Sequence, residues 1–217
     1  MQRDQVVGIV EENLREFCLE FLENPYLCYT EHGLHARFYS RLLSSLPDDL
    51  AYFAFRNERV CSVQKEYRTK EDLGKGRRQN WDISVIDAEQ AASNKSLSYD
   101  YLPLSAVVEF GLNASVGHLE DDIDRLGHSC EDTNIYGKPY IAHFYRISDN
   151  FSGRDLSPET KQNLSDAQSI MRMIKKDITV YFAVVDMTRS NVKGFWIISK
   201  NGIEEIRNNN CTEFKEK

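Results

Sequence analysis

The chain has 217 residues, 41% of them hydrophobic and 28% charged, with a formal net charge of −7. This composition excludes a disordered chain and fits a globular protein with a sizeable core. The acidic balance argues against broad non-specific binding of nucleic acid, because such binding prefers a basic surface, although a local basic patch can still attract a polyanion.

Targeting and redox features of the sequence point to a cytoplasmic protein. No apolar run approaches the roughly 20 residues that a membrane-spanning helix needs, and the N-terminus lacks the layout of a signal peptide. The five cysteines are irregularly spaced and form no Cys-x-x-Cys pair, as is typical of reduced thiols. We therefore expect a cytoplasmic location and no membrane partner.

The first half of the chain shows alternating helix and strand patterns. Apolar residues recur at helical spacing in two segments, which predicts helices over 4–23 and about 31–46. Three strands are predicted over 59–67, 81–86 and 104–112. A polar loop precedes the second strand and carries the run Gly74-Lys75-Gly76-Arg77-Arg78.

The second half predicts further strands and helices, and so one central sheet. The predicted elements are a helix over 118–126, a strand over 139–147, a helix from Ser157-Pro158 to about 176, and strands over 178–186 and 194–199. We expect an α/β chain with a central mixed β-sheet flanked by helices. It forms a single domain over 1–217, in which the helix 4–23 packs on a core at 30–147, and 157–199 extends the sheet.

Two carboxylates, Asp82 and Glu109, stand inside largely apolar strands. An ionised carboxylate in a buried strand is costly unless something pairs with it or binds it. If the two strands are neighbours, these carboxylates converge and repel each other, and a divalent cation relieves both problems. The Phe110 carbonyl could supply a further oxygen ligand, and hard cations such as Mg²⁺ favour oxygen.

This arrangement resembles the PD-(D/E)XK nuclease-like superfamily, which has the restriction-endonuclease-like fold. The resemblance covers residues 30–147: Asn80-Trp81-Asp82 stands at the family's Pro-Asp, Glu109 follows 27 residues later, and 118–126 matches the next helix. It implies that Asp82 and Glu109 bind Mg²⁺ or Mn²⁺, with Glu66 or Glu31 as an additional acid. The implied activity is phosphodiester hydrolysis in DNA or RNA.

One position departs from that family. The Glu-x-Lys motif would place a lysine at position 111, where this chain has Gly111. The amine can be supplied instead by Lys65 or Lys75, or its charge by Arg77 or Arg78, although arginine is a poor proton acceptor. Alternatively the metal activates the attacking water by lowering the pKa of the water bound to it. As a third alternative, the site is inactive and the fold binds a protein or nucleic-acid partner.

Several polar groups have two interpretations each. The basic residues of 65–78, among them Arg68, Arg77 and Arg78, form either a solvated hairpin loop or a phosphate-contacting loop. Glu31 and His35 share a helix face and form either a surface pair or part of the site. His118, Asp121 and Asp122 suggest either metal ligation or, as we expect for the two acids, a solvated acidic turn near a helix N-terminus.

The N-terminal helix raises a question of assembly. Its apolar stripe can cover the domain's own core, or it can pair with a second copy in a homodimer.

Overall fold

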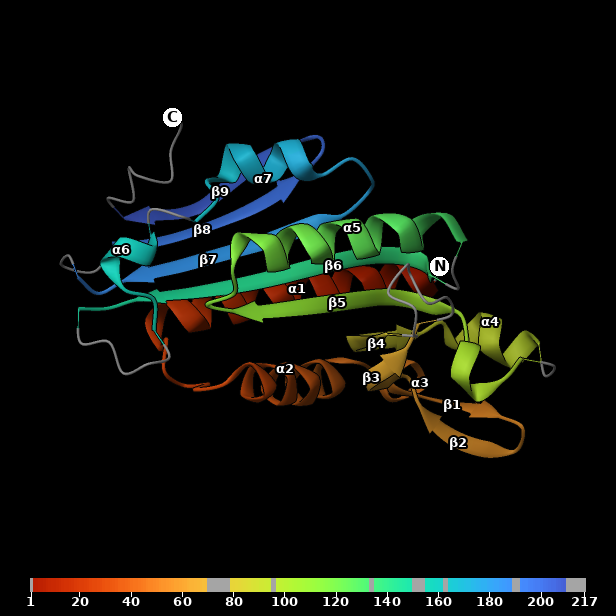
Figure 1. Cartoon of the computed structure of the whole chain (residues 1–217). Coiled ribbons are helices and arrows are strands. Elements are labelled where there is room, and N and C mark those ends of the chain that lie inside the picture. Colours follow the sequence, from red (N-terminus) through yellow and green to blue (C-terminus); the bar gives the residue numbers. More distant parts are fainter. Residues whose placement is uncertain are drawn as a thin grey trace.

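The computed structural model describes residues 2–69, 79–94, 97–132, 135–149, 155–161, 164–188 and 192–209. Its centre is a seven-stranded mixed sheet in the order β3-β4-β5-β6-β7-β8-β9 (Figure 1). The strands are β3 Val63–Arg68, β4 Asn80–Ile86, β5 Leu104–Leu112, β6 Ile135–Ile147, β7 Thr179–Asp186, β8 Val192–Ser199 and β9 Gly202–Asn209. The predicted α/β class with a central mixed sheet is confirmed.

The sheet combines an antiparallel and a parallel part. β3, β4 and β5 form an antiparallel meander. Helix α5 (Val116–Asp132) then carries the chain across to β6, which lies parallel to β5, and β7 is parallel to β6. A parallel pair needs such a crossover, whereas β8 and β9 follow as an antiparallel extension.

Helices cover both faces of the sheet. On one face lie α1 (Gln2–Glu23) and α2 (Glu31–Ser45), and on the other lie α5 and α7 (Ala167–Met173) (Figure 1). The apolar stripe of α1, which includes Leu14 and Phe17, is buried in the core against the chain's own sheet. The stripe therefore covers this core and is not left exposed for a second copy.

Local chemistry fixes the start and end of α2. The hydroxyl of Thr30 accepts a hydrogen bond from the Gly33 amide, so Thr30 caps the N-terminus. Leu46 leaves the helical conformation, and Pro47 follows it. The cap places the first turns of α2, with Glu31 and His35, beside the end of β5.

The structure corrects three predicted boundaries. The strand predicted over 59–67 is two strands that part at Ser62: β2 (Glu58–Cys61) pairs with β1 (Tyr52–Phe55), and β3 enters the main sheet. The Ser62 hydroxyl donates to the Leu50 carbonyl and holds this change of sheet.

The C-terminal third differs in a similar way. The helix predicted from Ser157 to 176 is two short helices, α6 (Pro158–Lys161) and α7. The sequence predicts no strand after residue 199, where the structure has β9, an edge strand whose composition is largely polar. The remaining helices are α3 Asp48–Ala51, α4 Ala88–Ser93 and a 3₁₀ turn at Tyr99–Tyr101.

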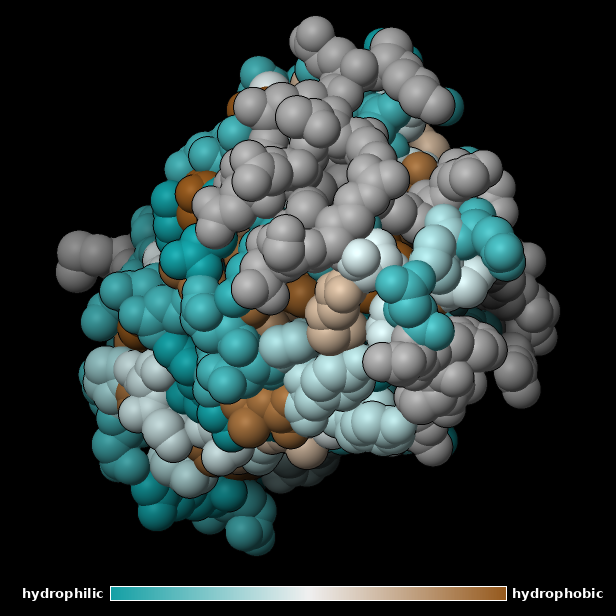
Figure 2. Space-filling model, turned by 90° about the vertical axis from the view of Figure 1, so that its left-hand side faces the viewer, coloured by the Kyte–Doolittle hydropathy of each residue, from teal (hydrophilic) through white to brown (hydrophobic). Residues whose placement is uncertain are grey.

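The surface is mainly polar where the C-terminal ends of β5–β7 lie. Figure 2 shows this side, and its apolar residues occur in small separate groups among hydrophilic ones. Within the described residues, no helix has the length and apolar character needed to cross a membrane.

Candidate metal centre

Three carboxylates lie in a row across β3, β4 and β5. The register pairs Ile83 of β4 with Val108 of β5, which places Asp82 opposite Glu109. On β3, the residues on either side of Glu66 pair with Ile83 and Trp81, the two neighbours of Asp82. The strand meander therefore places Glu66 and Glu109 on either side of Asp82 in the neighbouring strands.

The side chain of Asp82 accepts a hydrogen bond from β5 at a point where the backbone of β4 no longer pairs with it. The β4–β5 ladder begins at Ile83, so the amide of Phe110 lies beyond its end, and this amide donates to Asp82 Oδ2 at 2.8 Å. Burial raises the pKa of Asp82, while the Phe110 amide and a hydrogen bond with the Glu109 carboxyl lower it, and the net direction is upward. The hydrogen bond from the Phe110 amide thus fixes the position of the Asp82 carboxylate.

Glu109 is almost fully buried, at 2% exposure. Its Oε2 lies 2.9 Å from Arg125 Nη2, whereas its Oε1 receives no hydrogen bond from any described residue. Burial, and then the charge of Asp82, raise the pKa of Glu109 well above its usual range, although Arg125 opposes this. Without a cation the pair therefore tends to keep a proton between its two carboxyl groups.

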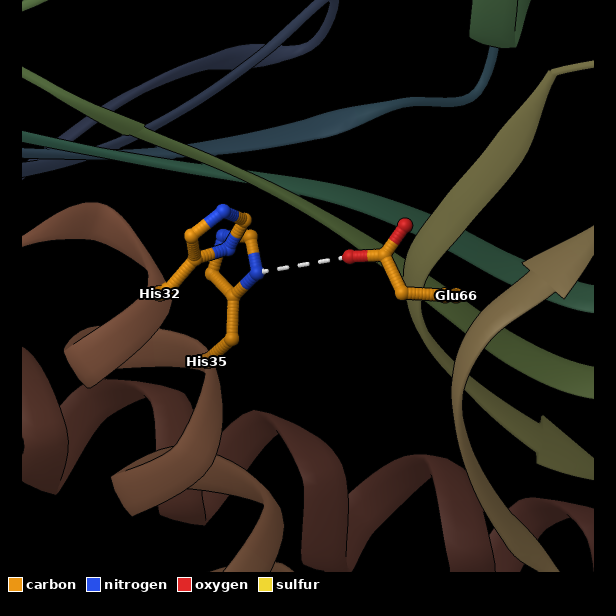
Figure 3. A group of neighbouring side chains, drawn as sticks. All are labelled: His32, His35 and Glu66. Carbon is orange, nitrogen blue, oxygen red and sulfur yellow. Dashed lines mark ion pairs between the residues drawn. The ribbon is translucent and has the colours of Figure 1, made fainter.

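His35 faces the same carboxylates from α2. Its Nε2 lies 3.5 Å from Asp82 Oδ2 and its Nδ1 lies 3.9 Å from Glu66 Oε1, a contact that Figure 3 marks. The imidazole is 1% exposed, and neither nitrogen has a hydrogen-bond partner among the described residues. Burial lowers the pKa of His35 to about 4, so the ring is neutral at pH 7 and can bind a metal.

The start of α2 adds two more groups. Figure 3 shows the exposed His32 beside His35, and the ligand atoms of His32, His35 and Glu66 all lie within 4.8 Å of one another. The carboxylate of Glu31 accepts a hydrogen bond from the Leu112 amide at 3.0 Å. His35 thus lies beside two of the predicted carboxylates, whereas Glu31 is satisfied by a backbone amide.

Backbone geometry also supports two predicted ligands. A strand residue directs its N–H and C=O to the same neighbour, so the Phe110 carbonyl lies on the edge of β5 that faces Asp82. Glu66 has a left-handed φ of 53°. Such a conformation is strained for a residue other than glycine and is often found at functional sites.

The predicted basic residues have different outcomes. Lys65 lies in β3 near His35, since its charge contributes to lowering the pKa of that imidazole. Arg68 is exposed at the end of β3. Lys75, Arg77 and Arg78 lie outside the described residues.

Position 111 has no room for a side chain. A Cβ added to Gly111 would lie 2.6 Å from the Cε1 and Nε2 atoms of His143 on β6. His143 is fully buried and is held by Asp122 Oδ2 at 3.0 Å and by the Tyr145 hydroxyl at 3.1 Å. A lysine at position 111 would therefore have to displace this imidazole.

Sequence reasoning missed the partners on α5. The expectation of a solvated acidic turn is wrong for Asp122, which is buried and bound by Arg125 Nη2 at 2.8 Å. The same nitrogen binds Glu109. The only hint in the sequence was the i, i+3 spacing of Asp122 and Arg125 on a predicted helix.

Ordinary pairing explains part of this arrangement. Asp82 is satisfied through one oxygen by a backbone amide, and Glu109 through one oxygen by Arg125. These contacts leave the second oxygen of Glu109 and both nitrogens of His35 without partners among the described residues. A dication bound at Asp82 would offset the negative charge that Asp82 and Glu109 place beside each other.

Comparison with known proteins yields no relative. No protein-family model, no curated protein and no solved structure matches the chain.

Proposed function

We propose that the chain is a divalent-metal-dependent phosphodiesterase that acts on nucleic acid. Asp82, Glu109 and Glu66 would hold Mg²⁺ or Mn²⁺, together with the Phe110 carbonyl and, as the structure adds, His35. The observation that carries this proposal is Asp82, which lies 3.5 Å from the His35 imidazole and contacts the buried Glu109 carboxyl, whose Oε1 receives no hydrogen bond from any described residue. The antiparallel meander followed by a helix and a parallel strand gives further support, since the resemblance implies this order.

In this proposal the metal, the carboxylates and Lys65 have separate roles. A bound Mg²⁺ or Mn²⁺ ion would supply an acidified water and polarise a phosphoryl oxygen. Asp82 is fixed by the Phe110 amide, and Glu109, whose pKa is raised, would lose its proton to solvent in order to hold the cation. Lys65, which lies near His35, would offset negative charge on the phosphate, since position 111 cannot carry an amine.

Substitution of the two central carboxylates tests the proposal. We expect Asp82→Asn and Glu109→Gln to weaken Mn²⁺ binding by at least about 10–100-fold and to abolish cleavage, because each removes a charge that faces the cation. Calorimetry with Mn²⁺ and cleavage of single- and double-stranded DNA and RNA are the measurements. Glu89→Gln, an exposed carboxylate on α4, serves as the control. Cleavage that survives in both site variants would contradict the assignment.

The raised pKa of Glu109 predicts a proton-coupled site. A carboxyl whose folded pKa is raised stabilises the fold below its unfolded pKa of about 4.3, and this stability is lost as pH rises toward the folded pKa. Without metal, we expect unfolding free energy to fall as pH rises above about 4, and less so in Glu109→Gln. Urea titrations of both proteins from pH 4 to 8 measure the difference.

The same shift affects cation binding. Mn²⁺ should displace the shared proton, so its affinity should rise with pH, and calorimetry in buffers of different ionisation enthalpy should detect proton release. If the pH profiles of the wild type and Glu109→Gln run parallel, Glu109 does not hold the proton.

A second candidate is a nuclease-fold module without activity that binds a protein or nucleic-acid partner. The imidazole at the motif's lysine position and the net charge of −7 favour it. Absence of Mn²⁺ binding, together with an Asp82→Ala variant at least as stable as the wild type, would select this candidate. For both candidates, binding of DNA or RNA and formation of a homodimer stay predictions. The cytoplasmic location also stays a prediction.

A further inference from the structure

A second group of metal-ligating side chains lies between α5 and β6, on the face of the sheet away from α2, where Glu109 also meets Arg125 of α5. His143 Nε2 and His118 Nε2 approach the same carboxylate oxygen, Asp122 Oδ2, at 3.0 and 3.4 Å. The ligand atoms of the three residues all lie within 4.8 Å of one another. Both Asp122 and His143 are buried, whereas the side chain of His118 is 48% exposed.

Neighbouring groups hold these ligands in a fixed orientation. The hydroxyl of Tyr145 lies 3.1 Å from Nδ1 of His143 and leaves its Nε2 directed at Asp122. Arg125 binds Oδ1 of Asp122 and leaves Oδ2 to face the two imidazoles. Outer contacts of this kind fix the tautomer and direction of metal-bound histidines and carboxylates.

Gly111 gives the buried imidazole its space. Any side chain at this position would overlap the ring of His143, so the backbone of β5 forms one wall of the group. The i, i+4 spacing of His118 and Asp122 on α5 sets the other two ligands on one helix face. An ordinary helix pair accounts for those two residues, but it does not account for a fully buried histidine aimed at the same oxygen.

We propose that His118, Asp122 and His143 bind a transition-metal dication of the zinc class. Two imidazoles and one carboxylate suit Zn²⁺ far better than Mg²⁺, which prefers oxygen ligands. Three protein ligands leave one coordination position, and the exposure of His118 opens it to solvent. This site shares no ligand with the Asp82 centre and does not depend on the phosphodiesterase proposal.

The test is Zn²⁺ and Co²⁺ binding by the full chain. We expect Zn²⁺ at a hundredfold excess over its dissociation constant to raise the melting temperature by about 5–10 °C. Co²⁺ should give the visible absorption of a four-coordinate ion. His118→Ala should weaken binding at least tenfold and still fold, because it removes a half-exposed side chain. Glu120→Ala, an exposed acid on the same helix, is the control.

The two metal centres are told apart by their variants. Zn²⁺ binding that is lost in His118→Ala and kept in Asp82→Asn and Glu109→Gln supports the proposal. Zn²⁺ binding that is unchanged in His118→Ala overturns it, as does the absence of any melting shift or cobalt absorption. Loss only in Asp82→Asn and Glu109→Gln also overturns it and assigns the zinc to the carboxylate row.

Discussion

Lysine at position 111 is expected to destabilise this protein by about 2–6 kcal/mol. The substitution introduces the lysine that the resemblance to the nuclease motif would place here, but its Cβ would meet the ring of His143 at 2.6 Å. Overpacking costs about 1–3 kcal/mol. Displacing the ring also breaks its contacts with Asp122 and Tyr145, which adds about 1–3 kcal/mol for buried polar groups left unpaired. Urea unfolding of Gly111→Lys measures the loss.

A double variant shows whether the clash is the cause. Gly111→Lys combined with His143→Ala removes the obstructing ring, so the two changes should be strongly non-additive and most of the lysine's cost should disappear. If the cost of the lysine is the same with and without the ring, backbone distortion of β5 is responsible instead. The double variant also presents a lysine beside Glu109, and any rise in its cleavage activity would identify the missing amine as the limiting group.

Arg146→Met is expected to cost about 3–5 kcal/mol of stability. Arg146 is fully buried, forms an ion pair with Asp155 at 3.1 Å, and donates to the carbonyls of Pro25, Cys28 and Tyr29. Methionine retains the apolar volume and loses the charge, which leaves a buried carboxylate unpaired. Thermal and urea unfolding measure the loss.

The effect should extend to the metal centre. The three carbonyls lie in the connection between α1 and α2, directly before the turns that carry Glu31 and His35. We therefore expect weaker Mn²⁺ binding in Arg146→Met, in addition to lower stability. Arg146→Met with Asp155→Leu removes both charges and should recover most of the stability, since it leaves no buried ion. Equal instability of the single and double variants would show that the lost carbonyl contacts matter most.

The sequence was sufficient to predict the sheet and the acids within it. Asp82 and Glu109 could be recognised as candidates because each is a single carboxylate in an apolar run, and charged residues are seldom buried without a partner. The convergence of Glu66 with them follows from strand register, which alternation and turn lengths constrain. The strands and their carboxylates could be predicted because they depend on the order of apolar and polar residues within a few neighbouring positions.

Contacts between distant elements could not be predicted in the same way. The imidazole over Gly111 belongs to the next strand in the sheet, and Arg125 reaches Glu109 from a helix; no sequence spacing encodes either contact. The change of sheet at Ser62 was hidden because β2 and β3 read as one continuous strand. The polar edge strand β9 lacks the apolar alternation by which strands are recognised.

The hydrogen bonds at the end of β5 have a consequence for tests of the proposed activity. The amides of Phe110 and Leu112 lie beyond the last β4–β5 pair, and the carboxylates of Asp82 and Glu31 serve as their partners. Two acids of the site are thus also parts of the sheet, and losing them would expose unsatisfied backbone. Both acids would therefore be needed for the sheet even if the proposed activity were absent. Glu109 Oε1 and the imidazole of His35, which form no hydrogen bond with the sheet, are the better test of the proposed activity.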